Sequence, residues 1–344
     1  SSASASPVQG NFSLAQSLAQ EILLSRPHSP TVLLLDEANP VFALPPGVHM
    51  REALEKIPFI ASFSSFIDES SAYADVILPD HSPLESWLDD APESGTTQAV
   101  VSLAPPTMRP LHNTRAMPDV LLEIARQLGE DVSSALPWKP FEDMLKASFE
   151  ELRGQFESAA SLDAGAFWNK AQEQGGWWDA EEKFAPPAHP LAAAREPLRL
   201  SDPQFDGPEK DYPFHFLPFE SQAFGDGSLA HLPWLQEMPD PLSTAMWSTW
   251  VEINPKTGDR LGIKQGDLVE VASQHGKLQA PALIAPGIAP DVVAMPVGQG
   301  HTNFTRYASG RGANPFSILA PMVVPETGSL AWAATRVKIT KVGE

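Results

Sequence analysis

Apolar residues in the first 130 positions follow helical spacing in some segments and form short uninterrupted runs in others. In residues 11–25, Leu14, Leu18 and Ile22 fall at helical spacing, which predicts a helix. Residues 31–36 are a continuous apolar run that ends in a turn, which is typical of a strand buried in a parallel sheet. The further elements predicted in this part are a helix over 45–56, a strand over 59–64, a turn or short helix over 69–74, a strand over 75–78 and a helix over 119–128. Strands that alternate with helices predict a parallel sheet with crossover helices.

The pattern changes after residue 139 and again after residue 208. Residues 140–184 are acidic and mostly helical in pattern, and residues 185–208 are rich in proline and alanine, as in a linker. Short strand-like runs separated by glycine and proline then predict a closed β-barrel. The predicted strands are 213–218, 250–253, 268–273, 278–284, 292–296 and 336–341. We therefore predict an α/β domain over 1–139, a helical insertion and linker over 140–208, and a β-barrel domain over 209–344.

Composition excludes several classes of function. The formal net charge of −20 argues against nucleic-acid binding, because contacts to phosphates need basic side chains. The same charge fits either a basic partner, such as a small cationic electron carrier, or simply a solvated acidic surface. Cysteine is absent, which excludes zinc–thiolate sites, cysteine-ligated iron–sulfur clusters, disulfides and cysteine nucleophiles in this chain. No segment approaches the roughly 18 to 20 apolar residues of a membrane helix, so we expect no direct membrane span.

Histidines and paired carboxylates form no recognisable catalytic or metal-binding motif. The nine histidines are scattered, without HxxxH or HExxH spacing, so we predict no metal site and no catalytic residue in this chain. Asp68-Glu69 and Asp89-Asp90 are adjacent carboxylates, and neighbours on one chain rarely converge on one substrate. We interpret both pairs as solvent-exposed loop residues.

Two glycine-rich segments near the C-terminus carry the most ligand-like pattern. They are Gly298-Gln-Gly300-His301 and Gly310-Arg311-Gly312-Ala313-Asn314. Closely spaced glycines let a ligand approach the backbone, but they also form ordinary turns between strands. The polar side chains of His301, Arg311 and Asn314 favour a binding site, because a simple turn does not need them. Elsewhere, Gly266-Asp267 is predicted to form a turn between two strands, with Gly266 at positive φ.

Four tryptophans lie in segments that are predicted to be rich in loops. They are Trp87, Trp234, Trp247 and Trp250. Tryptophan is enriched at the energetic centres of protein interfaces, which favours an interaction surface. Trp250 also fits the core of the barrel, because it begins a predicted strand.

Several motifs occur in an order that resembles one family. They are LDEANP (35–40), ADVILPDH (74–81), LESW (84–87), LPWLQE (232–237), WVEINP (250–255), LGIKQGDLVEV (261–271) and the glycine-rich cluster over 298–319. Together they resemble the C-terminal half of molybdopterin oxidoreductases of the dimethyl sulfoxide reductase superfamily. Within it, the chain is most similar to the molybdopterin-like subunit of alternative complex III, a quinol:electron-acceptor oxidoreductase, with menaquinone reductase and polysulfide reductase subunits as near neighbours. The resemblance covers nearly the whole chain and is loose over 140–208.

The resemblance implies an α/β domain followed by a double-psi β-barrel, which caps a bis-pterin cofactor in catalytic relatives. The positions that match the cofactor-facing motifs are Asn39, Gly300, His301, Arg311, Gly312 and Asn314. Amide and guanidinium donors suit a guanine edge and phosphates. In relatives that bind metal, the metal ligand and any cluster cysteines lie in the N-terminal half, which this sequence does not contain. The alternative-complex type of subunit is expected to lack both pterin and metal.

Three functions follow from these observations as hypotheses. The first is a non-catalytic structural and interaction module of a membrane-associated, quinol-oxidising electron-transfer complex, with no cofactor in this chain. The second is the cofactor-capping half of a true molybdenum bis-pterin oxidoreductase that another segment or chain completes, with a molybdopterin dinucleotide bound. The third, and weakest, is a free-standing barrel that binds a small molecule. Under the first, the expected partners are an iron–sulfur protein or domain, quinol-binding membrane subunits and cytochrome c subunits, at the periplasmic face of a bacterial membrane. Iron–sulfur clusters and haems are then expected in those partners.

Overall fold

The structure is a computed structural model that describes residues 12–91, 100–154, 156–178, 202–325 and 327–343. The chain divides into two compact units. Unit 1 comprises Ser1–Ile77 and Asp202–Glu344, and unit 2 comprises Leu78–Ser201. This division differs from the boundaries predicted at residues 139 and 208, because the first strands and helices pack with the barrel that follows much later in the sequence. The described part of the predicted linker begins at Asp202, and residues 185–201 lie outside the described residues.

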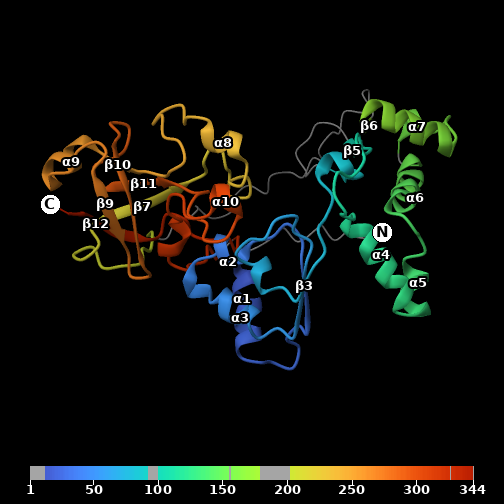
Figure 1. The fold of residues 1–344 in the computed structure, drawn as a ribbon, viewed down its shortest axis with the longest axis horizontal. Helices are drawn as coiled ribbons and strands as arrows, with labels where there is room; N and C mark the ends of the chain where they lie inside the picture. The colour runs from blue at the N-terminus through green and yellow to red at the C-terminus, as the bar shows by residue number, and fades with distance from the viewer. Residues whose placement is uncertain (1–11, 92–99, 155, 179–201, 326, 344) are drawn as a thin grey trace, which may run out of the picture. The chain divides into compact units, whose positions relative to one another are not determined.

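The first part of unit 1 is a small α/β layer (Figure 1). Its elements are α1 (Phe12–Leu23), β1 (Val32–Leu35), α2 (Pro40–Ala43), η1 (Pro46–Val48), α3 (Met50–Leu54), β2 (Phe59–Ser62), η2 (Ser71–Tyr73) and β3 (Val76–Ile77). The three strands are parallel in the order β1-β2-β3, with Leu34 opposite Ala61 and Ala61 opposite Val76. The helix expected over 45–56 is split into η1 and α3, because His49 between them adopts a left-handed conformation with φ of 58°.

The second part of unit 1 is a closed six-stranded barrel. Its strands are β7 (Phe214–Phe219), β8 (Val251–Ile253), β9 (Leu268–Ala272), β10 (Lys277–Ile284), β11 (Val292–Pro296) and β12 (Arg336–Lys341). They follow one another around the barrel in the order β10-β8-β11-β7-β12-β9, and the pairing of β9 with β10 closes the circle. Apolar side chains alternate into the interior, as Phe214 and Phe216 do on β7. A mixed α/β fold with a closed barrel, as predicted, is therefore confirmed.

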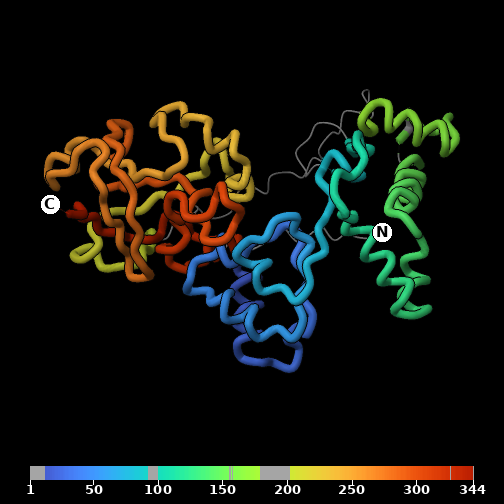
Figure 2. The backbone as a smooth tube through the Cα atoms, in the orientation of Figure 1, coloured from blue at the N-terminus to red at the C-terminus, as the bar shows by residue number. Residues whose placement is uncertain are grey.

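Short helices and two long connections link the strands of the barrel. The helices are α8 (Pro233–Glu237), α9 (Pro255–Leu261), α10 (Thr305–Ala308) and η5 (Pro315–Ile318). Asn254 caps α9, since its side chain accepts a hydrogen bond from the Lys256 amide. Gly266 has φ of 82°, which confirms the predicted positive φ, but the turn leads from α9 into β9 rather than from one strand to another. Figure 2 traces the two long connections, gold after β7 and orange-red after β11.

Unit 2 is mostly helical and holds a second sheet that the sequence analysis did not predict. Its helices are η3 (Pro83–Glu85), α4 (Met117–Gln127), α5 (Glu130–Ala135), α6 (Phe141–Arg153), η4 (Glu157–Ala159) and α7 (Ala164–Gln174). Its antiparallel strands are β4 (Leu88–Asp90), β5 (Val100–Ala104) and β6 (Gly176–Trp178). Aromatic rings dominate its core, where Trp87 packs on Trp168 and Phe167 on Trp177. No helix in the described part of either unit combines the length and apolar character that crossing a membrane requires.

Candidate functional site

The predicted site residues meet in unit 1, between the α/β layer and one end of the barrel. Asn39 follows β1 and stands directly before α2. Gly300 and His301 lie in the long connection after β11, and Arg311, Gly312 and Asn314 follow later in the same connection. Residues separated by more than 200 positions therefore form one cluster, which we call the polar cluster and define as the six predicted residues together with Glu69 and Ser70.

His301 is the central side chain of the polar cluster and is 2% exposed. Its ring stacks face to face on Phe42, with centroids 3.7 Å apart and planes 8° from parallel. Its Nδ1 lies 3.1 Å from Glu69 Oε2, and its Nε2 lies 3.1 Å from the carbonyl oxygen of Gly227. Both partners are acceptors, so the two contacts are satisfied together only by an imidazolium that donates from both nitrogens. The stack on Phe42 and the contacts of both nitrogens therefore fix the position of the ring.

Glu69 is the anionic partner, and its side chain is 6% exposed. Besides His301, its carboxylate accepts hydrogen bonds from Asn39 Nδ2 at 2.7 Å and from the Thr302 amide at 2.6 Å. The Asn303 amide donates to it at 3.2 Å. Burial by itself raises the pKa of Glu69, but the hydrogen bonds from His301 and Asn39 and the charge of His301 outweigh it and lower that pKa to about 2. Hydrogen bonds from several donors therefore hold the Glu69 carboxylate in place.

The exposed interpretation of Asp68-Glu69 is wrong. Asp68 is 6% exposed and Glu69 is 7% exposed. Asp68 turns inward because its Oδ1 accepts hydrogen bonds from the amides of Ser70 and Ser71, which fixes the turn that aims Glu69 at His301. The other pair, Asp89-Asp90, is exposed as expected, but it lies on strand β4 and not in a loop.

Asn39 and Asn314 also direct their side chains into the protein. Asn39 donates to Glu69 and accepts a 2.7 Å hydrogen bond from Ser70 Oγ. Asn314 Nδ2 donates to the Phe42 carbonyl at 2.9 Å. Its Oδ1 accepts from the Phe316 amide, so the same side chain caps η5. Both amide groups are therefore engaged within the chain at both ends.

The glycines of the cluster allow two backbone segments to approach each other closely. Gly300 has φ of 94°, and a Cβ atom there would lie 2.1 Å from the Asn314 amide nitrogen. The Gly300 amide donates to the Arg311 carbonyl at 2.8 Å. Gly312 has φ of 63°, and a Cβ atom there would lie 2.8 Å from Gln299 Cβ. The two glycines therefore allow two segments of the chain to pack closely against each other.

Arg311 differs from the other polar side chains of the cluster. Its guanidinium lies over the ring of Trp247, with Cζ 4.3 Å from the ring centroid. Its Nε is the one buried side-chain nitrogen or oxygen of the described residues that has no hydrogen-bond partner. Trp247 is held there by an uncommon backbone conformation, with φ of 57°. Among the predicted side chains, Arg311 is therefore the one with an unused hydrogen-bond donor in the described part of the chain.

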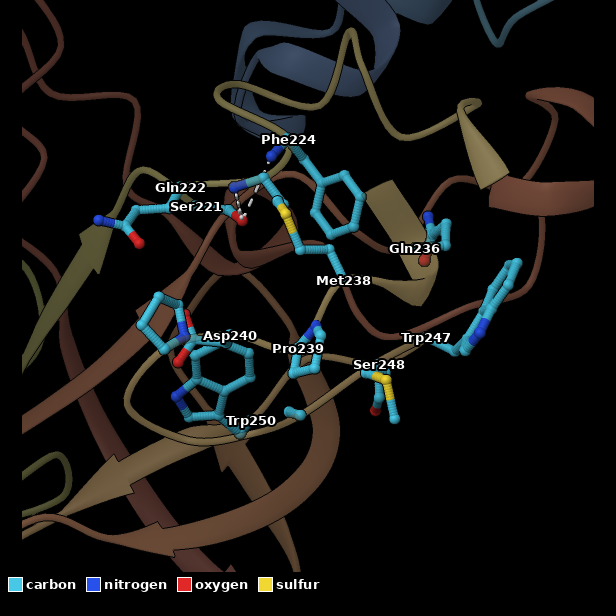
Figure 3. Close-up of a pocket in the computed structure, with 14 residues that line it drawn as sticks. Ser221, Gln222, Phe224, Gln236, Met238, Pro239, Asp240, Trp247, Ser248 and Trp250 are labelled. Atoms are coloured by element: carbon cyan, nitrogen blue, oxygen red, sulfur yellow. Dashed lines mark hydrogen bonds between the residues drawn. The ribbon is translucent and has the colours of Figure 1, made fainter. Parts of the chain in front are cut away.

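Trp247 also lines a cavity with a volume of about 360 Å³ (Figure 3). This volume is within the range of about 300–1,000 Å³ that is usual for ligand pockets. Phe224, Met238, Pro239 and Trp250 surround it, and their side chains make it largely apolar. Asp240 also lines the cavity, but its Oδ1 is engaged by the amides of Leu242 and Ser243, so it stabilises its own turn. Trp250 is 9% exposed and precedes β8, so it is buried at the wall of the cavity.

The donor set fits a pterin dinucleotide poorly. Such a ligand carries phosphates and a guanine edge, which need cations and free hydrogen-bonding groups. The side chains of Asn39, His301 and Asn314 have partners inside the chain, and Arg311 is the exception. Among the described residues, no group of three or more histidines, aspartates or glutamates is placed to hold a metal ion.

Sequence reasoning missed Glu69, Phe42 and Trp247. Glu69 is 232 positions from His301, and its neighbour Asp68 made it look like part of an ordinary acidic loop. Phe42 follows the LDEANP motif and stacks on His301, which no spacing rule predicts across the whole chain. Trp247 was identified as an interface residue, but its contact with Arg311 carried no sequence signal.

Comparisons with known proteins agree with this architecture. Residues 237–329 match the family described as "Molydopterin dinucleotide binding domain". The menaquinone reductase molybdopterin-binding-like subunit of Nitratidesulfovibrio vulgaris is 31% identical over 323 residues, which is 94% of this chain and 43% of that protein. The arsenate respiratory reductase molybdopterin-containing subunit of a Shewanella species is 25% identical in an alignment that covers 92% of this chain and 45% of that protein.

The acetylene hydratase of Pelobacter acetylenicus has a similar fold, with a TM-score of 0.70 and 17% identity over 95% of this chain and 46% of that one. The chain therefore spans less than half the length of each of these three relatives. The matched domain, the relatives and the shared fold agree with one another and with the motif order in the sequence. The chain is a homologue of the molybdopterin oxidoreductases of the dimethyl sulfoxide reductase superfamily and contains a molybdopterin dinucleotide-binding domain.

Proposed function

We propose that this chain is a non-catalytic structural and interaction part of a membrane-associated, quinol-oxidising electron-transfer complex of the alternative complex III type. A relative that matches 94% of the chain is named a molybdopterin-binding-like subunit of a menaquinone reductase, which supports a role in quinone-linked electron transfer. Because that relative is named for the reducing direction, the complex is to be assayed in both directions.

One observation carries this proposal. Of the four side chains expected to hold a pterin cofactor, all but Arg311 are instead bonded to one another or to the backbone: Asn39 to Glu69, His301 to Glu69 and Gly227, and Asn314 to Phe42. A cofactor site keeps its donors available, whereas a structural junction satisfies them internally. The polar cluster satisfies most of its donors internally, and it joins the α/β layer to the barrel.

Under this proposal the redox centres belong to partners. Without cysteine the chain supplies no thiolate to an iron–sulfur cluster, so the clusters and haems reside in an iron–sulfur protein and cytochrome c subunits. Quinol binds to membrane subunits, and this chain sits peripherally at the periplasmic face. Its net charge of −20 suits cationic partners on that side.

The test combines metal analysis with one substitution in the assembled complex. The chain, isolated from the complex, is expected to contain no stoichiometric molybdenum, tungsten or iron. Arg311→Ala is expected to leave quinol oxidation within about twofold of wild type, since that ratio corresponds to roughly 0.4 kcal/mol in the barrier. Arg306→Ala is the matched control, because Arg306 also lies over an aromatic ring, that of Tyr307, at 4.7 Å. Native gels establish that each variant complex is fully assembled.

Two results contradict the proposal. One is stoichiometric molybdenum or tungsten that follows this chain through purification. The other is loss of quinol oxidation in a fully assembled Arg311→Ala complex while the Arg306→Ala complex stays active. Arg311 is chosen alone because Asn314 also caps η5, and its removal would mix folding with function.

A second function is favoured by the domain match and by Arg311. Residues 237–329 match a molybdopterin dinucleotide-binding domain, and the Arg311 Nε is buried without a partner beside the Trp247 that lines the cavity. On this hypothesis the chain is the cofactor-capping half of a molybdenum bis-pterin oxidoreductase, and Arg311 contacts the dinucleotide. Either contradicting result above supports it.

A further inference from the structure

Two residues in the connection between α8 and β8 adopt the left-handed backbone conformation. Thr244 has φ of 59° and Trp247 has φ of 57°. This conformation is uncommon for residues other than glycine, and it is least favourable for β-branched and bulky side chains. Strained residues of this kind persist only where the surrounding contacts hold them, and they cluster at binding sites and in switch regions. The contacts of the two residues therefore decide what each one does.

The strain at Thr244 is held by a local loop. Asp240 Oδ1 accepts hydrogen bonds from the amides of Leu242 and Ser243. The Asp240 carbonyl accepts from the Thr244 amide at 2.9 Å, and the Asp240 amide donates to the Ala245 carbonyl at 3.1 Å. These bonds close the loop on itself, so Thr244 is fixed by its own neighbours in the sequence.

Trp247 is held by contacts with more distant segments. Its amide donates to the Gln236 carbonyl at 3.2 Å, and its ring lies against the guanidinium of Arg311. The side chains of Gln236 and Gln299 are both buried and exchange two hydrogen bonds, of 2.7 and 3.3 Å. Gly300, which follows Gln299, donates to the Arg311 carbonyl at 2.8 Å. These contacts form a closed circuit, and the stack on Arg311 joins the Trp247 ring to it.

The stack on Trp247 leaves Arg311 with an unsatisfied donor. The Arg311 Nε is buried and has no hydrogen-bond partner among the described residues. A donor that meets neither water nor an acceptor costs free energy. The observed position of Trp247 thus combines backbone strain with a desolvated donor, and the cation–π contact is an interaction that offsets them. Opposing contributions of similar size are the condition under which a residue populates two positions.

We infer that Trp247 is a two-position gate over Arg311. In the position observed, its ring lies on the guanidinium and points away from Pro239 and Trp250, at the edge of the cavity (Figure 3). In the second position, φ of Trp247 lies in the ordinary negative region, after a rotation of about 120° around the N–Cα bond. That rotation carries the indole off the guanidinium. The Arg311 Nε is then uncovered and can donate to water or to another molecule.

The inference goes beyond the proposed function and does not depend on it. If the chain is a structural module, the gate keeps the Arg311 donor covered in its main position. If another molecule binds Arg311 through Nε, the stack must open first, because a buried donor is out of its reach. The gate is therefore the same device under both functions.

Fluorine NMR of a single fluorinated tryptophan at position 247 of the full chain tests the gate. The resonance is sensitive to the surroundings of the ring, and saturation transfer detects a second position that is populated to about 1% or more. Trp177 is the matched control, because it also faces a cation, with Lys170 Nζ 5.3 Å from its ring centroid, but lies on β6 with no left-handed conformation. The label at 247 is studied in wild type, Arg311→Lys and Arg311→Met, and the label at 177 in wild type and Lys170→Met.

We expect the label at 247 to exchange with a minor state whose population rises at least about tenfold in Arg311→Met. A minor state that is detected only in Arg311→Met supports the inference equally. Arg311→Lys should give a smaller rise, because an ammonium group keeps the charge but lacks the planar stack. The label at 177 should give one resonance without exchange in both of its backgrounds.

Three results overturn the inference. If the label at 247 shows no exchange in wild type or in Arg311→Met, Trp247 is a fixed wall. If exchange is present but Arg311→Met leaves it unchanged, the stack does not hold the gate. If the label at 177 exchanges in the same way, the signal does not belong to the strained position. Should Arg311→Met fail to fold, Arg311→Lys carries the same test with the same sign. The readout involves neither quinol oxidation nor metal content, so its failure is distinct from a failure of the proposed function.

Discussion

Glu69→Gln tests the polar cluster at its most constrained point. The two side chains have the same shape, but glutamine carries no charge and has one donor end. Glu69 receives hydrogen bonds from Asn39, His301, Thr302 and Asn303, all of them donors. The glutamine NH₂ group must therefore face at least one donor, and the His301 imidazolium, 2% exposed, loses its anionic partner.

The size of the effect follows from the pKa of Glu69. That pKa is lowered from 4.5 to about 2, and a shift of this size corresponds to roughly 3 kcal/mol of folding free energy at neutral pH. Removing one partner of a buried ion pair typically costs about 3–5 kcal/mol. We therefore expect Glu69→Gln to lower the free energy of unfolding by about 3 kcal/mol at pH 7.

The dependence on pH identifies the cause. The pKa of Glu69 is lower in the folded state, so its contribution is complete above about pH 4.5 and is lost as the pH falls toward 2. The difference between wild type and Glu69→Gln should therefore be largest near pH 7 and shrink through this window.

Urea unfolding at a series of pH values measures the difference, and hydrogen exchange of a peptide over residues 298–304 reports the local effect. Glu209→Gln is the control, since Glu209 forms an ion pair with Arg336 but its side chain is 79% exposed. That control should change stability by less than about 1 kcal/mol. A Glu69→Gln effect no larger than that of Glu209→Gln, or one that is the same at pH 3 and pH 7, would refute the reasoning.

Three further substitutions test the loops that build the site, each by thermal melting. Gly300→Ala should destabilise the protein by about 4 kcal/mol or prevent folding, because its positive φ and a collision with backbone atoms act together. Gly310→Ala is the control and should cost only about 1 kcal/mol, because Gly310 has a positive φ but open space around it. Equal effects of the two substitutions would contradict this reasoning. Gly266→Val should cost about 1–3 kcal/mol through strain at its φ of 82°, and an unchanged melting temperature would mean that the turn tolerates a side chain. Asn254→Ala should cost about 1–2 kcal/mol, because it removes both the cap of α9 and the hydrogen bond that Nδ2 donates to the Ile288 carbonyl. Asn254→Ser should recover the part due to the cap, and no recovery at all would mean that the cap contributes little.

The barrel strands could be predicted from the sequence because the residues of each strand form a recognisable pattern of their own. The strands expected over 292–296 and 336–341 coincide with β11 and β12, since apolar runs bounded by glycine or proline define a strand locally. Two of the three strands in the sheet of unit 2, β4 and β6, had no such signal. Its β4 holds Leu88, Asp89 and Asp90, all exposed, and β6 begins at Gly176, so neither reads as an apolar strand.

Only part of the polar cluster could be predicted from the sequence. The motifs correctly brought Asn39, His301 and Asn314 to one place, but they did not say which way the side chains point. That direction depends on Glu69, whose approach is fixed by a turn at Asp68 in another part of the chain. A pattern of residue types carries information about proximity, whereas the pairing of donors with acceptors is decided only when distant segments pack.

The first strand, β1, shows the same contrast. The run of β1 resembles a strand buried on both faces, yet Val32 and Leu34 are half exposed in the structure. An apolar run predicts a strand, whereas the number of covered faces depends on which segments pack against the sheet. The polar cluster shows the reverse case, since residues typical of a ligand site are closed against one another. In both places the sequence indicates the local element or the residue types, whereas the packing of distant segments decides which groups are buried and which donors are bonded.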